Sequence, residues 1–111
     1  MNRILVASML GTVLLMGCIT VLPPPTLTPE GEKVRIATAD PSGTCKDLGA
    51  VVGNWGGKNY RVNGDAEELN VLRTFARNKV AELGGNVFRL ESEQRYVGRL
   101  QSLTGTAFKC P

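Results

Sequence analysis

Short apolar runs, separated by glycine- and proline-rich turns, dominate the pattern of residues 32–111. Such runs are typical of β-strands that are at least half-buried. They predict four strands, over 33–38, 45–52, 86–92 and 104–110. In the second of these, Leu48, Ala50 and Val52 are expected on one face, because side chains alternate along a strand. Residues 94–101 fit either a strand or a loop.

One longer segment, residues 66–83, has the spacing of an amphipathic helix. Its apolar stripe consists of Leu69, Leu72, Ala76, Val80 and Leu83, with Phe75 beside it. Asp65 is expected as the N-cap, with Glu68 completing the spacing of a capping box. Either Gly84 or Gly85 is expected to end the helix in the left-handed conformation. The order β-β-α-β-β therefore predicts an α+β fold, a small sheet with one helix packed on a face.

The N-terminal segment has a different pattern. Arg3 is followed by an almost continuous apolar run that ends near Met16. A cation followed by about a dozen apolar residues is the layout of a secretory signal peptide, and a permanent transmembrane helix needs about 20 residues. The alternative, a short buried core helix, would have little to pack on, because the prolines that begin at Pro23 end it. We therefore expect a signal peptide over residues 1–17.

The end of this run resembles the lipobox of bacterial lipoproteins. Leu15, Gly17 and Cys18 match the leucine, the small residue and the cysteine of that motif, and Met16 is tolerated between them. The resemblance implies that Cys18 becomes the acylated first residue, and each buried CH₂ of its lipid adds about 0.8 kcal/mol of membrane affinity. In lipoproteins of the enteric type, an Asp after the cysteine favours the inner membrane. The Ile19 found here therefore implies the outer membrane.

Residues 18–31 are expected to form the acylated cysteine and a proline-rich tether. Four of the chain's six prolines lie between positions 23 and 29, so neither a helix nor a central strand is expected there. In polyproline geometry this tether extends roughly 35–40 Å from the membrane. The alternative is an edge segment packed on the domain. The folded, periplasm-facing domain is then expected over residues 32–111.

The three cysteines divide between two roles. With Cys18 acylated, Cys45 and Cys110 remain as a pair in an oxidising compartment, which indicates one disulfide. The pair lacks the C-x-x-C spacing of redox centres, and two thiols without histidine cannot complete a tetrahedral metal site. The disulfide would close a loop of about 65 residues and contribute about 4 kcal/mol in the chain-entropy model. Neither a metal site nor a cofactor is expected.

Composition and charge limit the possible functions. The 111 residues carry 13 Lys+Arg, 10 Asp+Glu and no His, and the formal charge of +3 is too small to indicate a nucleic-acid-binding protein. Without histidine the commonest general base is missing, and neither the serines nor the carboxylates form a catalytic pattern. We therefore expect neither an enzyme nor a catalytic residue. The sequence leaves the oligomeric state open.

Two features are candidates for contact with a partner. Trp55 lies in a glycine-rich loop, where it either covers the sheet as a lid or inserts into a partner. Arg95 and Arg99 belong to a cation-rich C-terminal third, together with Arg89 and Lys109. These cations either contact an anionic envelope polymer such as lipopolysaccharide or form a solvated outer face of the sheet.

Three stretches of the domain, 45–51, 77–86 and 104–110, resemble a small group of proteobacterial lipoproteins catalogued as a domain of unknown function. That group shows a Cys before a Leu-Gly strand, a helix ending in Gly-Ala or Gly-Asn, and an aromatic–polar–Cys ending. More distantly, the outline is similar to the lipoprotein sensor of the Rcs envelope-stress pathway. The resemblance implies a proline-rich tether and a small disulfide-bonded domain that contacts partner proteins, although that sensor has four domain cysteines and this chain has two.

Together these features predict a lipid-anchored protein of the cell envelope that acts by binding. The first hypothesis is an interaction or stress-sensing module that contacts another envelope protein. The second is a binder of an anionic envelope glycan or lipid such as lipopolysaccharide. In both cases the membrane is a partner through the lipid anchor, and nucleic acid is not.

Overall fold

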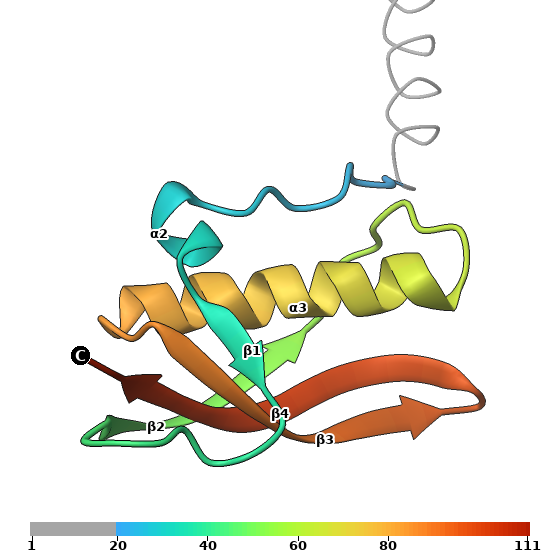
Figure 1. Cartoon of the computed structure of the whole chain (residues 1–111). Coiled ribbons are helices and arrows are strands. Elements are labelled where there is room, and N and C mark those ends of the chain that lie inside the picture. The colour runs from blue at the N-terminus through green and yellow to red at the C-terminus, as the bar shows by residue number, and fades with distance from the viewer. Residues whose placement is uncertain (1–19) are drawn as a thin grey trace, which may run out of the picture.

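The domain has two layers, a four-stranded sheet and a long helix packed on one of its faces (Figure 1). This computed structural model describes residues 20–111, so the expected signal peptide, Cys18 and Ile19 lie outside the described residues. The elements in chain order are α2 (Pro29–Glu32), β1 (Arg35–Ala37), β2 (Lys46–Asn54), α3 (Asp65–Glu82), β3 (Val87–Tyr96) and β4 (Arg99–Lys109). The predicted α+β fold is confirmed, with the short helix α2 added before β1. No helix within 20–111 has both the length and the apolar character needed to cross a membrane.

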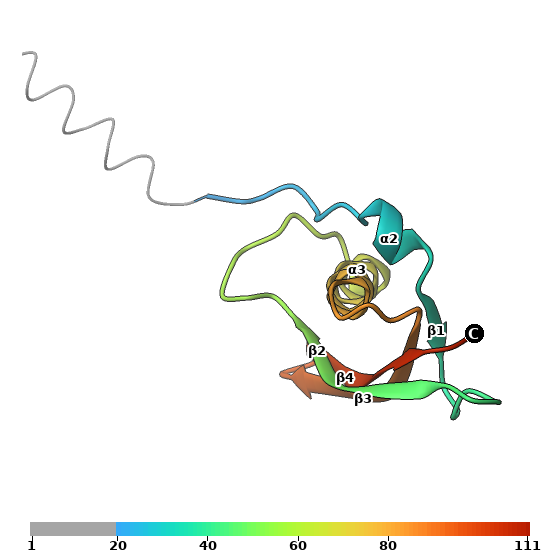
Figure 2. The same ribbon diagram turned by 90° about the vertical axis from the view of Figure 1, so that its left-hand side faces the viewer.

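The sheet has the strand order β1-β3-β4-β2. β1 pairs in parallel with β3, and the other two neighbouring pairs are antiparallel. β3 and β4 form a hairpin with a turn at Val97 and Gly98, which both have positive φ (51° and 78°), as a type I′ turn requires. Residues 94–101 therefore form the end of this hairpin. Figure 2, which views α3 end-on, shows the helix lying on one side of the twisted sheet.

The expectation that Leu48, Ala50 and Val52 share one face of β2 is wrong, because Leu48 packs against the core whereas Ala50 and Val52 are exposed. The pairing of β2 with β4 shifts its register just before Gly49, which marks a bulge. A bulge adds one residue to a strand and turns the following side chains to the opposite face. Val51 is therefore buried at 2% exposure, while Val52 is 48% exposed.

The core lies between α3 and the sheet, in two adjoining clusters. The first contains Val34, Val51, Ala76, Val80, Phe88 and Ala107, and the second contains Leu72, Leu100 and Leu103. Helix and sheet approach each other closely at Gly53, where an added Cβ would lie 2.5 Å from the carbonyl oxygen of Leu72. Only glycine fits at this point, and this close approach brings the end of β2 against the middle of α3.

The start of α3 differs from the prediction. Asp65 is the first helical residue, and the N-cap is Gly64, which has a φ of 101° and provides no side-chain cap. Glu68 forms no capping box and is buried instead. Glu67, instead of Glu68, contacts the backbone before the helix, because its carboxylate accepts a hydrogen bond from the N–H of Asn63. Glu68 is thereby free to form a contact across the domain.

The end of α3 agrees with the prediction. Gly84 takes the left-handed conformation with a φ of 83°, and its N–H donates to the carbonyl of Ala81 at 2.9 Å. The apolar stripe ends one turn early, because Leu83 is 44% exposed whereas Val80 is fully buried.

Cys45 and Cys110 form the predicted disulfide. It joins the residue before β2 to the residue after β4, with the two Cα atoms 4.2 Å apart. The side chain of Asn86 fixes the same end of the sheet, because it accepts from the N–H of Cys110 at 2.8 Å and donates to its carbonyl at 2.9 Å. The C-terminus is therefore held both covalently and by hydrogen bonds.

The segment before β1 is packed on the domain, which differs from the solvated tether expected over 18–31. α2 begins at Pro29, where proline is tolerated because the first N–H groups of a helix have no helical partner. Thr28 caps this helix by accepting a hydrogen bond from the N–H of Gly31 at 2.9 Å. Gly31 is itself buried. From Leu22 onward, a packed edge segment describes the structure better than an extended spacer.

Candidate binding pocket

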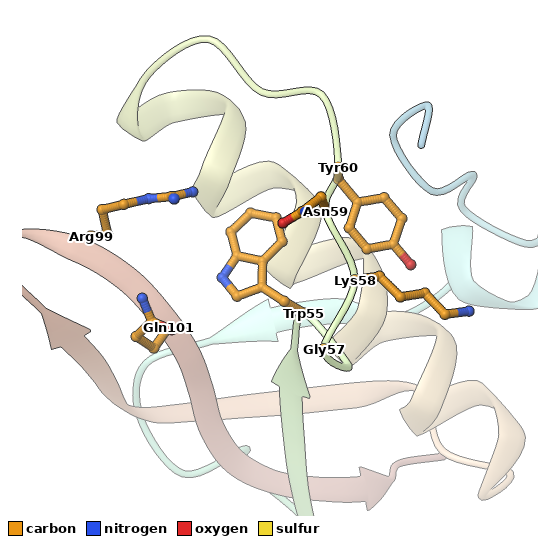
Figure 3. Close-up of a pocket in the computed structure, with 7 residues that line it drawn as sticks. All are labelled: Trp55, Gly57, Lys58, Asn59, Tyr60, Arg99 and Gln101. Atoms are coloured by element: carbon orange, nitrogen blue, oxygen red, sulfur yellow. The ribbon is translucent and has the colours of Figure 1, made fainter. Parts of the chain in front are cut away.

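A pocket of about 370 Å³ opens where β2 ends and β4 begins (Figure 3). It is lined by Trp55, Gly57, Lys58, Asn59, Tyr60, Arg99 and Gln101. The loop after β2 supplies five of these residues, and the start of β4 supplies the other two. Two of the three contact candidates from the sequence, Trp55 and Arg99, therefore lie in one pocket.

Trp55 forms one wall of the pocket and covers part of the core. Its indole packs against the cluster of Leu72, Leu100 and Leu103. Its Nε1–H donates to the carbonyl of Leu100 at 2.9 Å, so the polar end of the ring is satisfied inside the domain. The residue has the position of a lid, and it also presents a surface to the pocket (Figure 3).

Tyr60 extends this aromatic wall. Its ring centroid lies 6.2 Å from that of Trp55 and 5.4 Å from that of Phe75 on α3, with an edge-on arrangement in the second pair. Edge-on and tilted aromatic pairs add about 0.5–1.5 kcal/mol each beyond their buried area. The series of rings Trp55–Tyr60–Phe75 thereby attaches the loop to α3 and holds the aromatic wall of the pocket in place.

Arg99 is positioned by a buried carboxylate. Its Nε donates to Oε2 of Glu68 at 2.9 Å; the Glu68 side chain is 6% exposed, and that of Arg99 is 63% exposed. A carboxylate this buried needs a partner, because removing one member of such a pair leaves an uncompensated charge. The pair therefore fixes the base of the guanidinium while most of the Arg99 side chain remains in solvent at the pocket rim.

The charge of the pocket is positive. Among the described residues, those that line it include two cations, Lys58 and Arg99, and no carboxylate. The ion pair with Glu68 partly compensates the charge of Arg99. Figure 3 shows the two cations on opposite sides of the Trp55 ring, with the Lys58 ammonium directed away from the guanidinium of Arg99. A guanidinium, an ammonium and the amides of Asn59 and Gln101 are suitable donors for a carboxylate, a phosphate or a sugar hydroxyl. Within 20–111, no three His, Cys, Asp or Glu side chains lie together as a metal site requires.

Comparison with known families identifies the domain. Residues 25–110 match a family described as a domain of unknown function (DUF4156). The chain belongs to the DUF4156 family. The DUF4156 match begins at Pro25, within the segment expected from the sequence to be a tether. No curated protein and no solved structure matches the chain, so nothing connects this DUF4156 member with the Rcs sensor.

Arg95, the third contact candidate, lies outside the pocket of the DUF4156 domain. Its guanidinium pairs with Glu93 on the same strand at 3.3 Å. The structure therefore does not bring Arg95 together with Trp55 and Arg99. The sequence pattern indicated no binding role for Lys58 or Tyr60, and it assigned Glu68 to a capping box. For Lys58 and Tyr60, the sequence offered one indication of a binding role, namely a cation and an aromatic residue close after the glycines of the loop.

Arg89 belongs to a separate cluster of the DUF4156 domain. Its guanidinium pairs with Glu91 and with Asp40 and lies 5.2 Å from the centroid of the Phe108 ring. The hydrogen bond from Arg89, followed by that from Thr106, lowers the pKa of Glu91, and the bonds to Glu91 and Asp40 raise the pKa of Arg89. Because Asp40 lies between β1 and β2, this cluster fastens that connection to the sheet.

A second hollow, of about 390 Å³, lies between β2 and α3 of the DUF4156 domain. It is lined by Val52, Asn54, Phe75, Asn78, Lys79 and Glu82. β2 is an edge strand of the sheet, paired only with β4, so one side of its backbone has no strand partner among the described residues. The hollow thus runs beside an unpaired strand edge that carries an exposed Val52.

Proposed function

We propose that this protein is a lipid-anchored, non-catalytic binding module of the cell envelope, and that its pocket takes an anionic group of an envelope glycan or lipid. The observation that carries the proposal is the pocket itself. Trp55 and Arg99, two candidates distant in sequence, line it together with Lys58. An aromatic ring with a cation on each side suits a ligand that has both a ring or chain to pack and a negative charge to neutralise.

The anchor in this proposal is the acylated Cys18. Its support is the sequence pattern, a cation and an apolar run that end in Leu15, Gly17 and Cys18. Ile19 supports the outer membrane as the destination, with the domain in the periplasm. An oxidising compartment is also the setting in which a disulfide such as Cys45–Cys110 persists.

Binding rather than catalysis is supported by the side chains of the pocket. A hydrolytic site needs a nucleophile with an adjacent base, or two carboxylates facing one another. The side chains that line the described pocket include Lys58, Tyr60 and Arg99, which offer hydrogen-bond donors. Such a set holds an anion without activating a nucleophile.

The test is binding of the full acylated protein to lipopolysaccharide and to peptidoglycan fragments at low and high salt. We expect saturable binding that weakens with salt, because exposed charges are screened over about 8–10 Å at physiological ionic strength. Lys58→Gln should weaken binding about tenfold, the loss of one charge-assisted hydrogen bond. Lys33→Gln removes an exposed cation outside the pocket and is the matched control. Binding by neither ligand, or equal losses in both variants, would refute the proposal.

A second candidate function, an interaction or stress-sensing module, is favoured by the free edge of β2. An extended segment of a partner protein can add a strand to such an edge, with its side chains in the adjoining hollow. The test is in-cell photo-crosslinking from position 52 in β2, compared with position 59 in the pocket. A protein crosslinked from position 52 alone supports this candidate, and the absence of any crosslinked protein from either position refutes it.

A further inference from the structure

The N-terminal segment is fastened to the pocket loop by its backbone. The N–H of Leu22 donates to the carbonyl of Asn59, and the carbonyl of Leu22 accepts from the N–H of Arg61, both at 2.8 Å. These bonds form a parallel bridge between Leu22 and Tyr60. Because Asn59 and Tyr60 also line the pocket, Leu22 lies directly behind the pocket wall. Among the described residues, Leu22 is the first that is hydrogen-bonded to the rest of the domain.

Two side chains of α3 fasten the rest of the segment. Asn78 accepts from the backbone N–H of Thr28 at 2.9 Å and donates to the carbonyl of Thr26 at 3.1 Å. Arg77 donates to the carbonyls of Val34 and Glu32 at 2.8 and 2.9 Å. The segment is therefore attached to the domain at several points between residues 22 and 34. It cannot act as a free spacer over that length.

This attachment shortens the connection to the proposed lipid anchor. Between Cys18 and Leu22 there are four residue steps, which span at most about 14 Å when fully extended. The polar headgroup layer of a bilayer is about 5–8 Å thick on each side. A domain whose chain is fastened at Leu22 is therefore held within about two headgroup layers of the acyl chains, and the pocket loop is the part fastened there.

We propose that the pocket faces the membrane that holds the acylated Cys18, and that Lys58 and Arg99, which flank Trp55, each contact the phosphate of an anionic lipid headgroup in that membrane. This inference rests on the proposed function, since it requires the lipid anchor and an anion-binding pocket. It names both the ligand, a phosphate diester of a membrane lipid, and the orientation of the domain.

The side chains of the loop suit such a position. Trp55 and Tyr60 have amphipathic rings of the kind that lie at the membrane–water interface. Basic groups are attracted to an anionic lipid surface, and this electrostatic attraction strengthens membrane attachment by a lipid anchor. Lys58 and Arg99 supply that attraction beside the anchored end, whereas α2 and the C-terminal half of α3 lie at the far end of the helix (Figure 1).

The orientation is tested with the intrinsic fluorescence of Trp55, the single tryptophan of the chain. The full-length acylated protein is reconstituted in nanodiscs that contain a phospholipid spin-labelled on its headgroup. We expect strong quenching of Trp55. Insertion of a flexible Gly-Ser spacer between Thr20 and Val21 should reduce this quenching severalfold, because it lengthens only the part of the chain before the first fastened residue. The same spacer inserted between Ser42 and Gly43 is the control and should leave the quenching unchanged.

The ligand is tested by titration of the same protein, in phosphatidylcholine nanodiscs, with three probes: short-chain phosphatidylglycerol, short-chain phosphatidylcholine and inorganic phosphate. We expect phosphatidylglycerol to bind most tightly, and Lys58→Gln to weaken its binding about tenfold. Lys33→Gln should have no effect. For Arg99 the informative variant is Arg99→Gln combined with Glu68→Gln, because it removes the cation without leaving the buried carboxylate unpaired.

The outcomes separate this inference from the proposed function. Mass spectrometry of the reconstituted protein shows whether Cys18 is acylated, and an unmodified Cys18 refutes the proposed anchor. An acylated protein with unquenched Trp55, or with the same quenching after spacer insertion, refutes the orientation alone. If inorganic phosphate binds as tightly as phosphatidylglycerol, the ligand is free phosphate and the headgroup assignment is wrong. If phosphatidylglycerol does not bind, the assignment is also wrong.

Discussion

Replacement of Trp55 by alanine tests whether its indole is part of the core or only a contact surface. Truncation of a fully buried Phe or Trp to Ala costs about 3–5 kcal/mol. Trp55 packs on Leu72, Leu100 and Leu103 with one side and faces the pocket with the other, so part of that value applies. We expect Trp55→Ala to lower the free energy of unfolding by about 2–3 kcal/mol, of which the hydrogen bond to Leu100 accounts for about 1 kcal/mol.

The assay is urea unfolding of the oxidised full-length protein in mild detergent, followed by far-ultraviolet circular dichroism because the variant has no tryptophan fluorescence. Trp55→Phe is the matched variant, since it keeps most of the apolar packing and loses the Nε1–H. It should cost only about 1 kcal/mol.

A small loss of stability in Trp55→Ala would refute the role of the indole as a lid on the core. Exposed side chains that contact nothing usually change stability by less than about 0.5 kcal/mol when they are substituted. If Trp55→Ala falls within that range, the indole does not act as a lid, and its packing against the second core cluster contributes nothing to stability. Equal losses for Trp55→Ala and Trp55→Phe would instead show that the hydrogen bond, rather than the packing, carries the effect.

Three further predictions concern the scaffold. Replacing both Cys45 and Cys110 by serine should lower the free energy of unfolding by about 4 kcal/mol, measured by chemical denaturation, because the disulfide closes a loop of about 65 residues; an unchanged midpoint would contradict this. Since Arg89 lowers the pKa of Glu91, their pair should stabilise the fold at neutral pH and lose this effect as the pH falls through that lowered pKa. Glu91→Gln should therefore flatten the acid side of a profile of unfolding free energy against pH. An identical profile for the variant and the parent protein would show that the pair does not contribute to stability. Gly105→Ala should destabilise the domain by about 1–3 kcal/mol or more, because the added Cβ would lie 2.1 Å from the carbonyl oxygen of Arg89, and a calorimetric melting temperature equal to that of the parent protein would contradict this close contact.

Much of the architecture follows from local patterns. The helix and its glycine stop were predictable, because Gly84 follows an apolar stripe with a 3.6-residue period, and glycine adopts the left-handed conformation without strain. The predictions that were wrong concern features that depend on contacts with a neighbouring element. The inward face of β2 is shifted by a bulge in its pairing with β4, and two adjacent valines, Val51 and Val52, give no hint of which one is buried.

The sequence predicted two residues of the pocket as separate contact candidates, but it did not predict that they share one pocket. Trp55 and Arg99 are 44 positions apart in sequence, and no periodicity relates a loop to the start of a later strand. They meet because the hairpin turn at Val97 and Gly98 brings the start of β4 beside the end of β2. Glu68 could not be assigned from sequence, since its spacing from Asp65 equally fits a capping box; the glycine cap and the contact with Arg99 decide its role.

The sequence by itself determined the α+β class of the fold, the order of its long helix and four strands, and the disulfide partners. These features depend on local periodicity, on the conformational preferences of glycine and proline, and on the pairing of two cysteines. Only the tertiary structure decided that the proline-rich segment folds back on α3, and that the loop carrying Trp55 and Lys58 is fastened to it at Leu22. Backbone hydrogen bonds at Leu22, and bonds from the side chains of Arg77 and Asn78 to backbone groups, make that attachment. In each bond at least one partner is a backbone group, and because every residue type carries the same backbone carbonyl, that partner leaves no pattern in the amino-acid sequence.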